Sequence, residues 1–186
     1  RKMILGILTT LAVILIGYGI VIYNRLVRLR NTSQSAWSDI DVQVKKRYDL
    51  VPNLVETVKG YAAHERTLLE KLTEARSVGM KASGPAQAAK AENLFRDALK
   101  SLFAVAEAYP DLKANQNFMQ LQIQLKDLED GIESARRYYN AVVRDFNTAV
   151  EQFPSNLIAS RFKFAQKDFF ELTTPEVERK PVPVSF

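Results

Sequence analysis

The chain has no cysteine and only one histidine and one tryptophan among its 186 residues. Without cysteine there is no disulfide framework, no Cys-ligated zinc site and no thiol nucleophile. A single histidine, His64, cannot form a His-rich metal site, and adjacent helical residues such as His64 and Glu65 do not face each other as an acid–base pair would. The motifs of P-loop, dinucleotide-binding and nucleophile-elbow sites are also missing. We therefore expect no enzymatic activity, no catalytic or metal-binding residues and no cofactor.

The excess of basic over acidic residues is also small. The formal net charge is +5, from 26 basic and 21 acidic side chains. Arg1 and Lys2 precede the first apolar stretch, so the rest of the chain has 24 basic and 21 acidic residues, a net charge of +3. Because this surplus is small and spread along the chain, it does not predict a nucleic-acid-binding surface.

The longest uncharged stretch, MILGILTTLAVILIGYGIVIY, runs for 21 residues from Met3 to Tyr23. A helix of this length crosses a hydrocarbon core of about 30 Å. The alternative is a secretory signal peptide, whose apolar region is usually only about 7–15 residues and ends in a small-residue cleavage site. The stretch is longer than that, and Tyr18 and Tyr23 lie near its far end, where interfacial aromatic residues occur. It predicts a retained single-pass anchor over residues 1–24.

After the anchor, apolar residues continue at helical spacing through Pro52, at Trp37, Ile40, Val44, Tyr48, Val51, Val55, Val58 and Ala62. Steps of three and four residues keep a single phase, so we predict one helix from about Asn31 to Arg76, bent at Pro52 and continuous with the anchor. Leu69 and Leu72 prolong the stripe. The alternative is a helix that ends near Asp49 and restarts with Pro52 in its first turn, where proline is tolerated.

Three more helices are predicted. The stretch SVGMKASGPA, residues 77–86, predicts a loop, and a helix follows over about 86–108. The strictest pattern covers 118–153, where apolar residues alternate steps of three and four over five heptads before Pro154. A shorter amphipathic helix is predicted to follow, from the spacing of Ile158, Phe162, Ala165, Phe169 and Leu172.

No segment has the pattern of a β-strand. The predicted fold class is all-α, with an N-terminal transmembrane helix that continues into an antiparallel bundle of long helices. The bundle has three long helices and a shorter C-terminal helix, without a sheet. The predicted divisions are the anchor (1–24), the helical bundle (25–172) and a proline-containing extended tail (173–186).

Three asparagines and one proline are candidates for structural or interaction roles. Asn140 and Asn147 lie one heptad apart, each directly after a residue of the apolar seam, where a partly buried asparagine can set helix register. Asn53 follows Pro52 and can satisfy the carbonyl that a proline bend frees. Register and bend support is the favoured interpretation of these positions, and ligand binding is the alternative.

The stretch RFKFAQKDFF, residues 161–170, mixes phenylalanine with basic residues. Core packing is the favoured interpretation, because Phe162 and Phe169 fall on the helical stripe. The alternatives are stacking with a single-stranded nucleic acid and contact with an anionic membrane surface. Phe162, Phe164 and Trp37 are kept as interaction candidates.

Four segments together resemble the LemA family: YNRLVRLRN, AWSDIDVQVKKRYDLVPNLVETVKGYAAHE, ARRYYNAVVRDFN and FPSNLIA. They occur in the family's order and span most of the chain between residues 23 and 160. The resemblance implies a bacterial protein with one N-terminal transmembrane helix, a bundle of long helices and no established enzymatic activity. It also implies a link to membrane organisation, since relatives in magnetic bacteria are associated with invaginated membranes.

These features predict a non-enzymatic, membrane-anchored scaffold that self-associates or docks partners through its bundle and organises or remodels the bacterial membrane. The alternative is an adaptor or sensor in envelope signalling or stress response that works through a partner protein. We expect a homo-oligomer, and no nucleic-acid partner, in the bacterial cytoplasmic (inner) membrane. Two basic residues precede the apolar stretch and three follow it closely, so the flanking charges assign the bundle to neither side.

Overall fold

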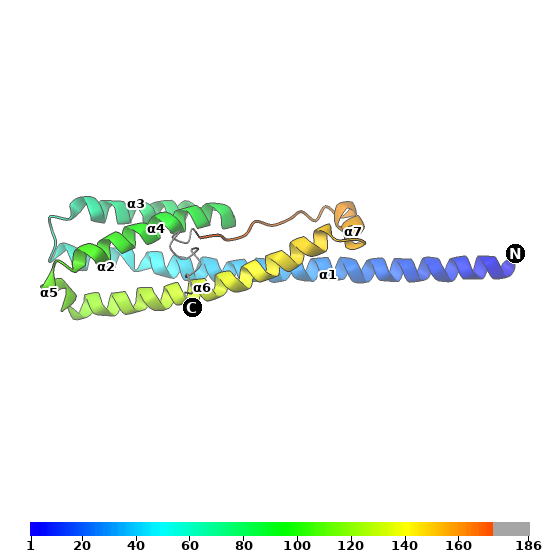
Figure 1. Ribbon diagram of the computed structural model, residues 1–186, viewed down its shortest axis with the longest axis horizontal. Helices are drawn as coiled ribbons and strands as arrows, with labels where there is room; N and C mark the ends of the chain where they lie inside the picture. Colours follow the sequence, from blue (N-terminus) through cyan, green and yellow to red (C-terminus); the bar gives the residue numbers. More distant parts are fainter. Residues whose placement is uncertain (173–186) are drawn as a thin grey trace, which may run out of the picture. The chain divides into compact units, whose positions relative to one another are not determined.

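The computed structural model describes residues 1–172, which contain helices and no strand. The helices are α1 (Lys2–Asp49), α2 (Val51–Lys59), α3 (Arg66–Lys81), α4 (Gly84–Ala106), α5 (Pro110–Lys113), α6 (Gln116–Glu151) and α7 (Ser155–Arg161) (Figure 1). The predicted all-α class is confirmed. The predicted extended tail, 173–186, lies outside the described residues.

The chain divides into two compact units, and α1 and α6 each contribute to both. Unit 1 consists of Arg1–Asp41 and Ser134–Phe169, and the described part of unit 2 consists of Val42–Glu133 and residues 170–172.

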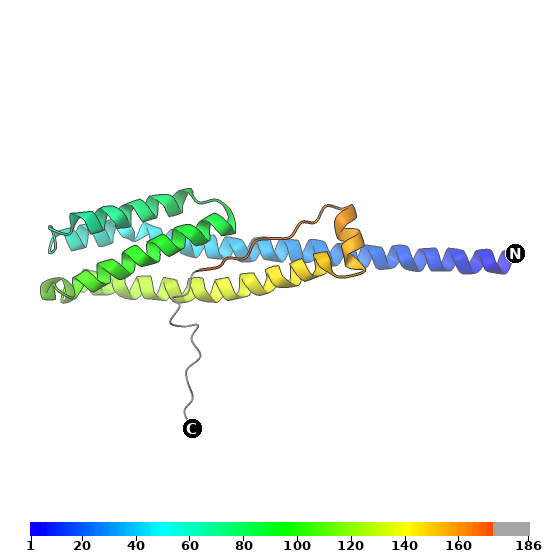
Figure 2. The same ribbon diagram turned by 45° about the horizontal axis from the view of Figure 1, so that its top comes forward.

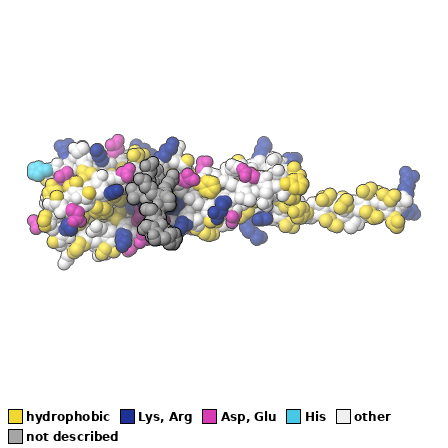
Figure 3. All heavy atoms as spheres, in the orientation of Figure 1, with side chains coloured by type: hydrophobic (Ala, Val, Ile, Leu, Met, Phe, Trp, Pro, Cys, Tyr) yellow, Lys and Arg dark blue, Asp and Glu magenta, His cyan; other side chains and the backbone are white. Residues whose placement is uncertain are grey.

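The first half of α1 has an exposed apolar surface. Its side chains from residue 3 to residue 18 are all exposed, and Figure 3 shows hydrophobic groups along this part of the helix. Within residues 1–172, α1 is the one helix long and apolar enough to cross a membrane. Because apolar side chains gain free energy by leaving water, such exposure is typical of an anchor rather than of a core helix.

In unit 1, α1 lies antiparallel to the second half of α6, and α7 packs beside both (Figure 1). The core of this region consists of Leu26, Phe146, Ala149, Ala159 and Phe164. These residues come from α1, α6, α7 and the segment after α7. The N-terminal helix and three consecutive segments near the end of the described chain therefore bury one common cluster.

The predicted helix over 155–172 is wrong beyond Arg161, where α7 ends. From Phe162 the chain is not helical, and Lys163 has a positive φ of 56°. The segment runs back along α6 in both views (Figures 1 and 2). Side chains of α6 bind its backbone, so the hydrogen bonds of the segment are made to α6 instead of to a further helical turn.

Unit 2 contains the end of α1, the first half of α6 and all of α2, α3, α4 and α5. α3 and α4 form a hairpin that lies against the other helices, as both ribbon views show (Figures 1 and 2). The buried apolar residues of this unit include Val44, Tyr48, Val51, Leu54, Leu69, Leu72, Phe95, Leu102, Phe118 and Ile132. They recur at helical spacing on each element, which is why the sequence pattern predicted the helical class, although not every helix boundary.

The helix predicted from Asn31 to Arg76 is interrupted twice. α1 ends at Asp49 and α2 begins at Val51 with Pro52 in its first turn, as the alternative interpretation had it. Leu50 keeps helical dihedral angles (φ −79°, ψ −18°), and its carbonyl accepts the N–H of Leu54 at 3.0 Å. The apolar stripe therefore keeps its phase through Pro52, even though the helix is divided there.

The second interruption is a reversal after Lys59, where α2 ends. Leu69 and Leu72, which prolonged the predicted stripe, belong to α3 instead. The turn residues GYAAHE contain one glycine, Gly60, and no proline or asparagine, so local turn chemistry gave only a weak signal of the reversal.

The predicted loop over 77–86 is mostly helical. α3 continues to Lys81, and only two residues separate it from Gly84, which begins α4 with a φ of 77°. Gly79 lies inside α3, where a Cβ atom would overlap the ring and hydroxyl of Tyr48. This glycine allows close packing of α3 on α1 and does not mark a loop.

Candidate functional site

Asn147 of α6 holds the extended segment after α7. Its side-chain amide donates to the Lys167 carbonyl at 2.9 Å, and its carbonyl oxygen accepts the Lys167 N–H at 2.9 Å. The hydroxyl of Tyr139 donates to the Asp168 carbonyl at 2.8 Å. Two α6 side chains thus satisfy three backbone groups of a segment that lacks a helical or strand partner of its own.

Tyr139 also makes an aromatic contact with Trp37. The centroids of the two rings lie 5.6 Å apart, and Tyr139 is almost fully buried. Burial, together with the charge of Asp168, raises the pKa of Tyr139 to about 12. Its neighbour Asn140 is half-buried and, with Arg136, Arg137, Ala141, Arg144 and Phe169, lines a hollow of about 340 Å³.

The two phenylalanines of the RFKF stretch lie in opposite environments. Phe164 is buried, with ring contacts to Tyr23 and Phe146 at 5.8 and 6.4 Å. The guanidinium of Arg30 lies 5.2 Å from the centroid of the Phe164 ring. Phe162 is 53% exposed, with one face against Tyr23 at 4.7 Å.

Pro52 and Asn53 are exposed residues of α2. The Asn53 backbone carbonyl accepts the hydroxyl of Thr57 at 2.8 Å. Asn53 lines a polar hollow of unit 2 that also includes Tyr61 and Asn115, whose side chains are hydrogen-bonded at 2.9 Å. Asn53 therefore belongs to a different unit from Asn140 and Asn147, and the structure does not combine the three asparagines in one site.

Sequence reasoning missed a buried ion-pair network in unit 2, here called the Arg47 network. The Arg47 guanidinium pairs with Glu92 of α4 and with Glu129 of α6, and Arg96 contacts Glu129 at 3.1 Å. The Tyr48 hydroxyl donates to Glu92. Arg47 and Glu92 are 1% and 0% exposed. Acidic side chains from α4 and α6 therefore surround the guanidinium of Arg47, which belongs to α1.

Burial determines the acid–base properties of this network. Desolvation lowers the pKa of Arg47 to about 10, and it raises the pKa of Tyr48 to about 12. The sequence carried one signal for the network. Glu92 stands in the apolar series of α4, three residues before Phe95 and seven before Leu99, so a carboxylate is placed on the buried face.

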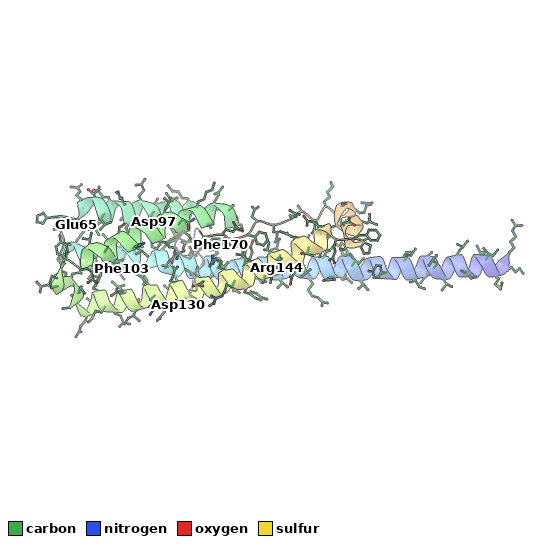
Figure 4. All side chains as sticks on the ribbon, in the orientation of Figure 1. Glu65, Asp97, Phe103, Asp130, Arg144 and Phe170 are labelled. Atoms are coloured by element: carbon green, nitrogen blue, oxygen red, sulfur yellow. The ribbon has the colours of Figure 1, made fainter. Side chains whose placement is uncertain are left out.

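An apolar groove opens beside the Arg47 network, between α4 and α6, and is here called the α4–α6 groove. It has a volume of about 560 Å³ and is lined by Arg47, Arg96, Leu99, Lys100, Phe103, Gln122, Ile123, Leu125, Lys126 and Glu129. Figure 4 shows Phe103 between the two helices. The groove combines an apolar floor with cationic side chains at its rim, an arrangement suited to binding an apolar segment that carries acidic groups.

Among residues 1–172, no three His, Cys, Asp or Glu side chains are grouped so that they could hold a metal ion. The fold and surfaces of residues 1–172 define a class: an all-α protein with one long apolar N-terminal helix and a helical region that carries an apolar groove.

The family model of the LemA family matches residues 36–186, and the chain belongs to this family. Protein LemA of Metamycoplasma hominis is 29% identical, over 87% of this chain and 74% of the relative. Magnetosome protein MamQ 2 of Paramagnetospirillum magneticum is 24% identical, over 88% of this chain and 72% of the relative. MamQ of Magnetospirillum gryphiswaldense is 23% identical over the same shares. Family membership and the apolar helix together indicate a membrane-associated helical protein.

Proposed function

We propose that this protein is a non-enzymatic, membrane-anchored scaffold that associates with further copies of itself through the α4–α6 groove. The observation that carries the proposal is the groove itself, an apolar hollow of about 560 Å³ left open beside the Arg47 network, of which Arg47 and Glu92 are buried. The names of the relatives describe a family and an organelle and no reaction, which agrees with a non-enzymatic role.

A second copy fits the groove because the rim of the groove and the adjacent face of α6 have opposite charges. Ile123 of α6 is 56% exposed at the groove. Asp127 and Asp130 follow it by four and seven residues, so they lie on the same helix face, and both are exposed. The basic rim includes Arg96 and Lys100 of α4.

In a pair related by a twofold axis, each contact between an acidic residue of α6 and a basic residue of the rim would occur twice. In such an isologous pair, the acidic face of α6 from one copy lies over the α4 rim of the other, and the exposed isoleucines meet near the axis. Since the chain is tied to a membrane, copies paired in this way would gather the membrane that carries them. That two relatives are named as magnetosome proteins supports a role connected with an organised membrane.

The test uses site-specific crosslinking of the full-length protein in its native membrane, because the chain has no cysteine of its own. Ile123→Cys is expected to give a crosslinked dimer with a short bis-maleimide. Leu94→Cys is the matched control, since Leu94 is 55% exposed on α4 and does not line the groove. It should give little or no dimer.

Charge reversal separates specific pairing from random collision. Lys100→Glu should abolish the Ile123→Cys dimer, and adding Asp127→Lys should restore it. Equal crosslinking at positions 123 and 94, or no dimer at either position, would refute self-association through this groove. The latter result would favour the alternative of an adaptor or sensor that acts through a different protein.

A further inference from the structure

Three large apolar side chains are exposed where α6 turns into α7. Phe153 is 78% exposed, Leu157 is 60% exposed and Phe162 is 53% exposed. Leu157 lies on the seven-residue helix α7, Phe153 precedes this helix and Phe162 follows it. The other face of α7 is buried in the core of unit 1. We call these three residues the α6–α7 corner. So much apolar surface gathered at one end of a packed unit indicates a contact with an apolar partner.

The corner lies beside the end of the apolar stretch of α1. The Cδ1 atom of Ile158 is 3.7 Å from the place that a Cβ atom would take on Gly19. The ring of Phe162 packs on Tyr23 with 4.7 Å between the centroids. Gly19 and Tyr23 form the last turn of the uncharged stretch, and four residues correspond to about 6 Å along a helix.

The core of unit 1 keeps the corner in this place. Leu26, Phe146, Ala159 and Phe164 are buried together, and Ile22 and Tyr23 pack against them. Because α7 is held against α1 by this cluster, it cannot move along α1 without exposing the cluster to water. Figure 3 shows hydrophobic side chains gathered at the end of unit 1 from which the apolar part of α1 emerges.

Basic side chains lie next to the corner. Arg25 and Arg28 follow Tyr23 on α1, while Arg161 and Lys163 come directly after the buried part of α7, and all four are exposed. Apart from Arg1 and Lys2, the segments of unit 1 contain nine basic and five acidic residues, a net charge of +4. The side of unit 1 that meets the end of the apolar stretch thus has cations as well as exposed aromatic and aliphatic groups.

We propose that the α6–α7 corner is a second membrane contact, which inserts into the headgroup region of the bilayer and favours anionic lipids. When the apolar stretch of α1 occupies the hydrocarbon core, the corner lies within one helical turn of its end. That level matches the roughly 5–10 Å depth at which interfacial apolar groups bury themselves. Exposed arginine and lysine beside them then meet anionic headgroups, which attract basic segments next to a membrane span.

Together, the α1 anchor and the α6–α7 corner would determine the orientation of the helical region relative to the membrane. A transmembrane helix alone leaves the rotation and tilt of the helical region free. A corner held on one side of α1 keeps that side turned towards the bilayer surface. The proposal rests on the apolar stretch lying in a membrane. It does not depend on self-association, because the corner and the α4–α6 groove belong to different units.

The test measures depth with single spin labels on the full-length protein in nanodiscs, with and without phosphatidylglycerol. The site Leu157→Cys reports on the corner, Ile14→Cys on the middle of the apolar stretch, and Leu94→Cys on an exposed position of unit 2. The three side chains have similar exposure, at 60%, 61% and 55%. Label accessibility to oxygen, which concentrates in lipid, is compared with accessibility to a water-soluble nickel complex.

At position 157 we expect an oxygen-to-nickel accessibility ratio several-fold above that at position 94 and below that at position 14. The ratio should rise further in anionic nanodiscs, and the combination Arg161→Gln and Lys163→Asn should remove that rise. Asparagine is chosen because it tolerates the positive φ of Lys163.

A label at 157 that matches the label at 94 in every lipid would overturn the proposal. So would a label at 157 that is shielded from both reagents and shows spin–spin broadening, since that result would assign the corner to a second copy of the chain. If the label at 14 is also in water, the apolar stretch itself is not in the membrane, and the proposal fails for that reason. A label at 157 in water with the label at 14 in lipid overturns this proposal alone and leaves crosslinking at position 123 unaffected, whereas a label at 14 in water also removes the membrane anchor from the proposed function.

Discussion

The side chain of Asn147 binds both hydrogen-bonding groups of one backbone residue, Lys167, with two bonds of 2.9 Å. The pair lies 20 residues apart in sequence and joins the long helix α6 to a segment without regular structure. This relationship holds the segment after α7 against α6 within unit 1 and gives the predicted asparagine a definite structural contact.

Asn147→Ala is expected to destabilise the protein by about 1–3 kcal/mol, because it leaves the N–H and carbonyl of Lys167 without partners in a half-buried place. Hydrogen exchange of the Lys167 amide should accelerate at the same time. Asn53→Ala is the control, since Asn53 is exposed on α2, and it should change stability by less than about 0.5 kcal/mol. Equal effects of the two changes on thermal unfolding would contradict this assignment.

Glu92→Ala should lower the free energy of unfolding by about 3–5 kcal/mol, since it leaves the buried Arg47 guanidinium without its fully buried partner. The double variant Arg47→Met with Glu92→Leu should be markedly more stable than Glu92→Ala, because apolar residues of similar size avoid the desolvation cost of the charges. Urea denaturation followed by circular dichroism compares them. A double variant that is less stable than the single one would show that the network contributes more than its desolvation costs.

Gly79→Ala should cost about 1–3 kcal/mol, although alanine favours helices, because the new Cβ atom overlaps Tyr48. Gly60→Ala is the matched control. Gly60 has helical dihedral angles (φ −64°, ψ −22°), and a Cβ atom there meets only ordinary contact at 3.5 Å. That change should be neutral or stabilise by up to about 1 kcal/mol. Thermal melts that rank the two variants in the opposite order would refute the close packing at Gly79.

The protein should lose stability as the pH rises from about 10 towards 12. Burial raises the pKa of Tyr139 to about 12, above the value of about 10 in an unfolded chain. The folded state therefore keeps this proton after the unfolded state has released it, so the stabilisation is complete below pH 10 and is lost through this range. Tyr48 acts in the same direction, and Arg47, with its pKa lowered to about 10, acts in the opposite one.

Tyr139→Phe isolates one of these groups. The variant loses the hydrogen bond to Asp168, so it should melt at a lower temperature at neutral pH. The decline of its melting temperature between about pH 10 and 12 should be shallower than in the unchanged protein, because the residue that releases a proton on unfolding is gone. Parallel declines in the two proteins would contradict a raised pKa at Tyr139.

Long, strictly periodic segments were predictable because their burial repeats with the helical period. α6, with its uninterrupted seam from Phe118 onward, and the continuity of the apolar stretch with the following helix both follow from that pattern. The reversal between α2 and α3 did not follow, because the apolar stripe keeps its spacing into α3 and the turn has a single glycine, Gly60, without a proline. The segment after Arg161 was mistaken for a helix because Phe162, Ala165, Phe169 and Leu172 stand at helical spacing. Of these, Phe162, Ala165 and Phe169 are exposed, and the buried rings are those of Phe164 and Phe170, which lie off that spacing.

The candidate residues divide in the same way. Asn147 was recognisable as a polar residue next to an apolar seam, but its partner Lys167 was not, because the two come together only when the chain folds back along α6. Glu92 was recognisable as a carboxylate in an apolar series, whereas its pairing with Arg47 required the approach of α1 to α4. Phe162 and Phe164 look alike in sequence and differ only in which one the core of unit 1 encloses.

The sequence by itself determined the helical class, the apolar N-terminal helix and the faces that each helix buries, because these depend on local periodicity and composition. The tertiary structure decided where helices end against one another, why Gly79 must lack a side chain, which charges are paired in the interior and which apolar residues stay exposed at the α6–α7 corner. The physical reason is that burial and pairing depend on groups brought together from distant positions, and neither is encoded in a local pattern.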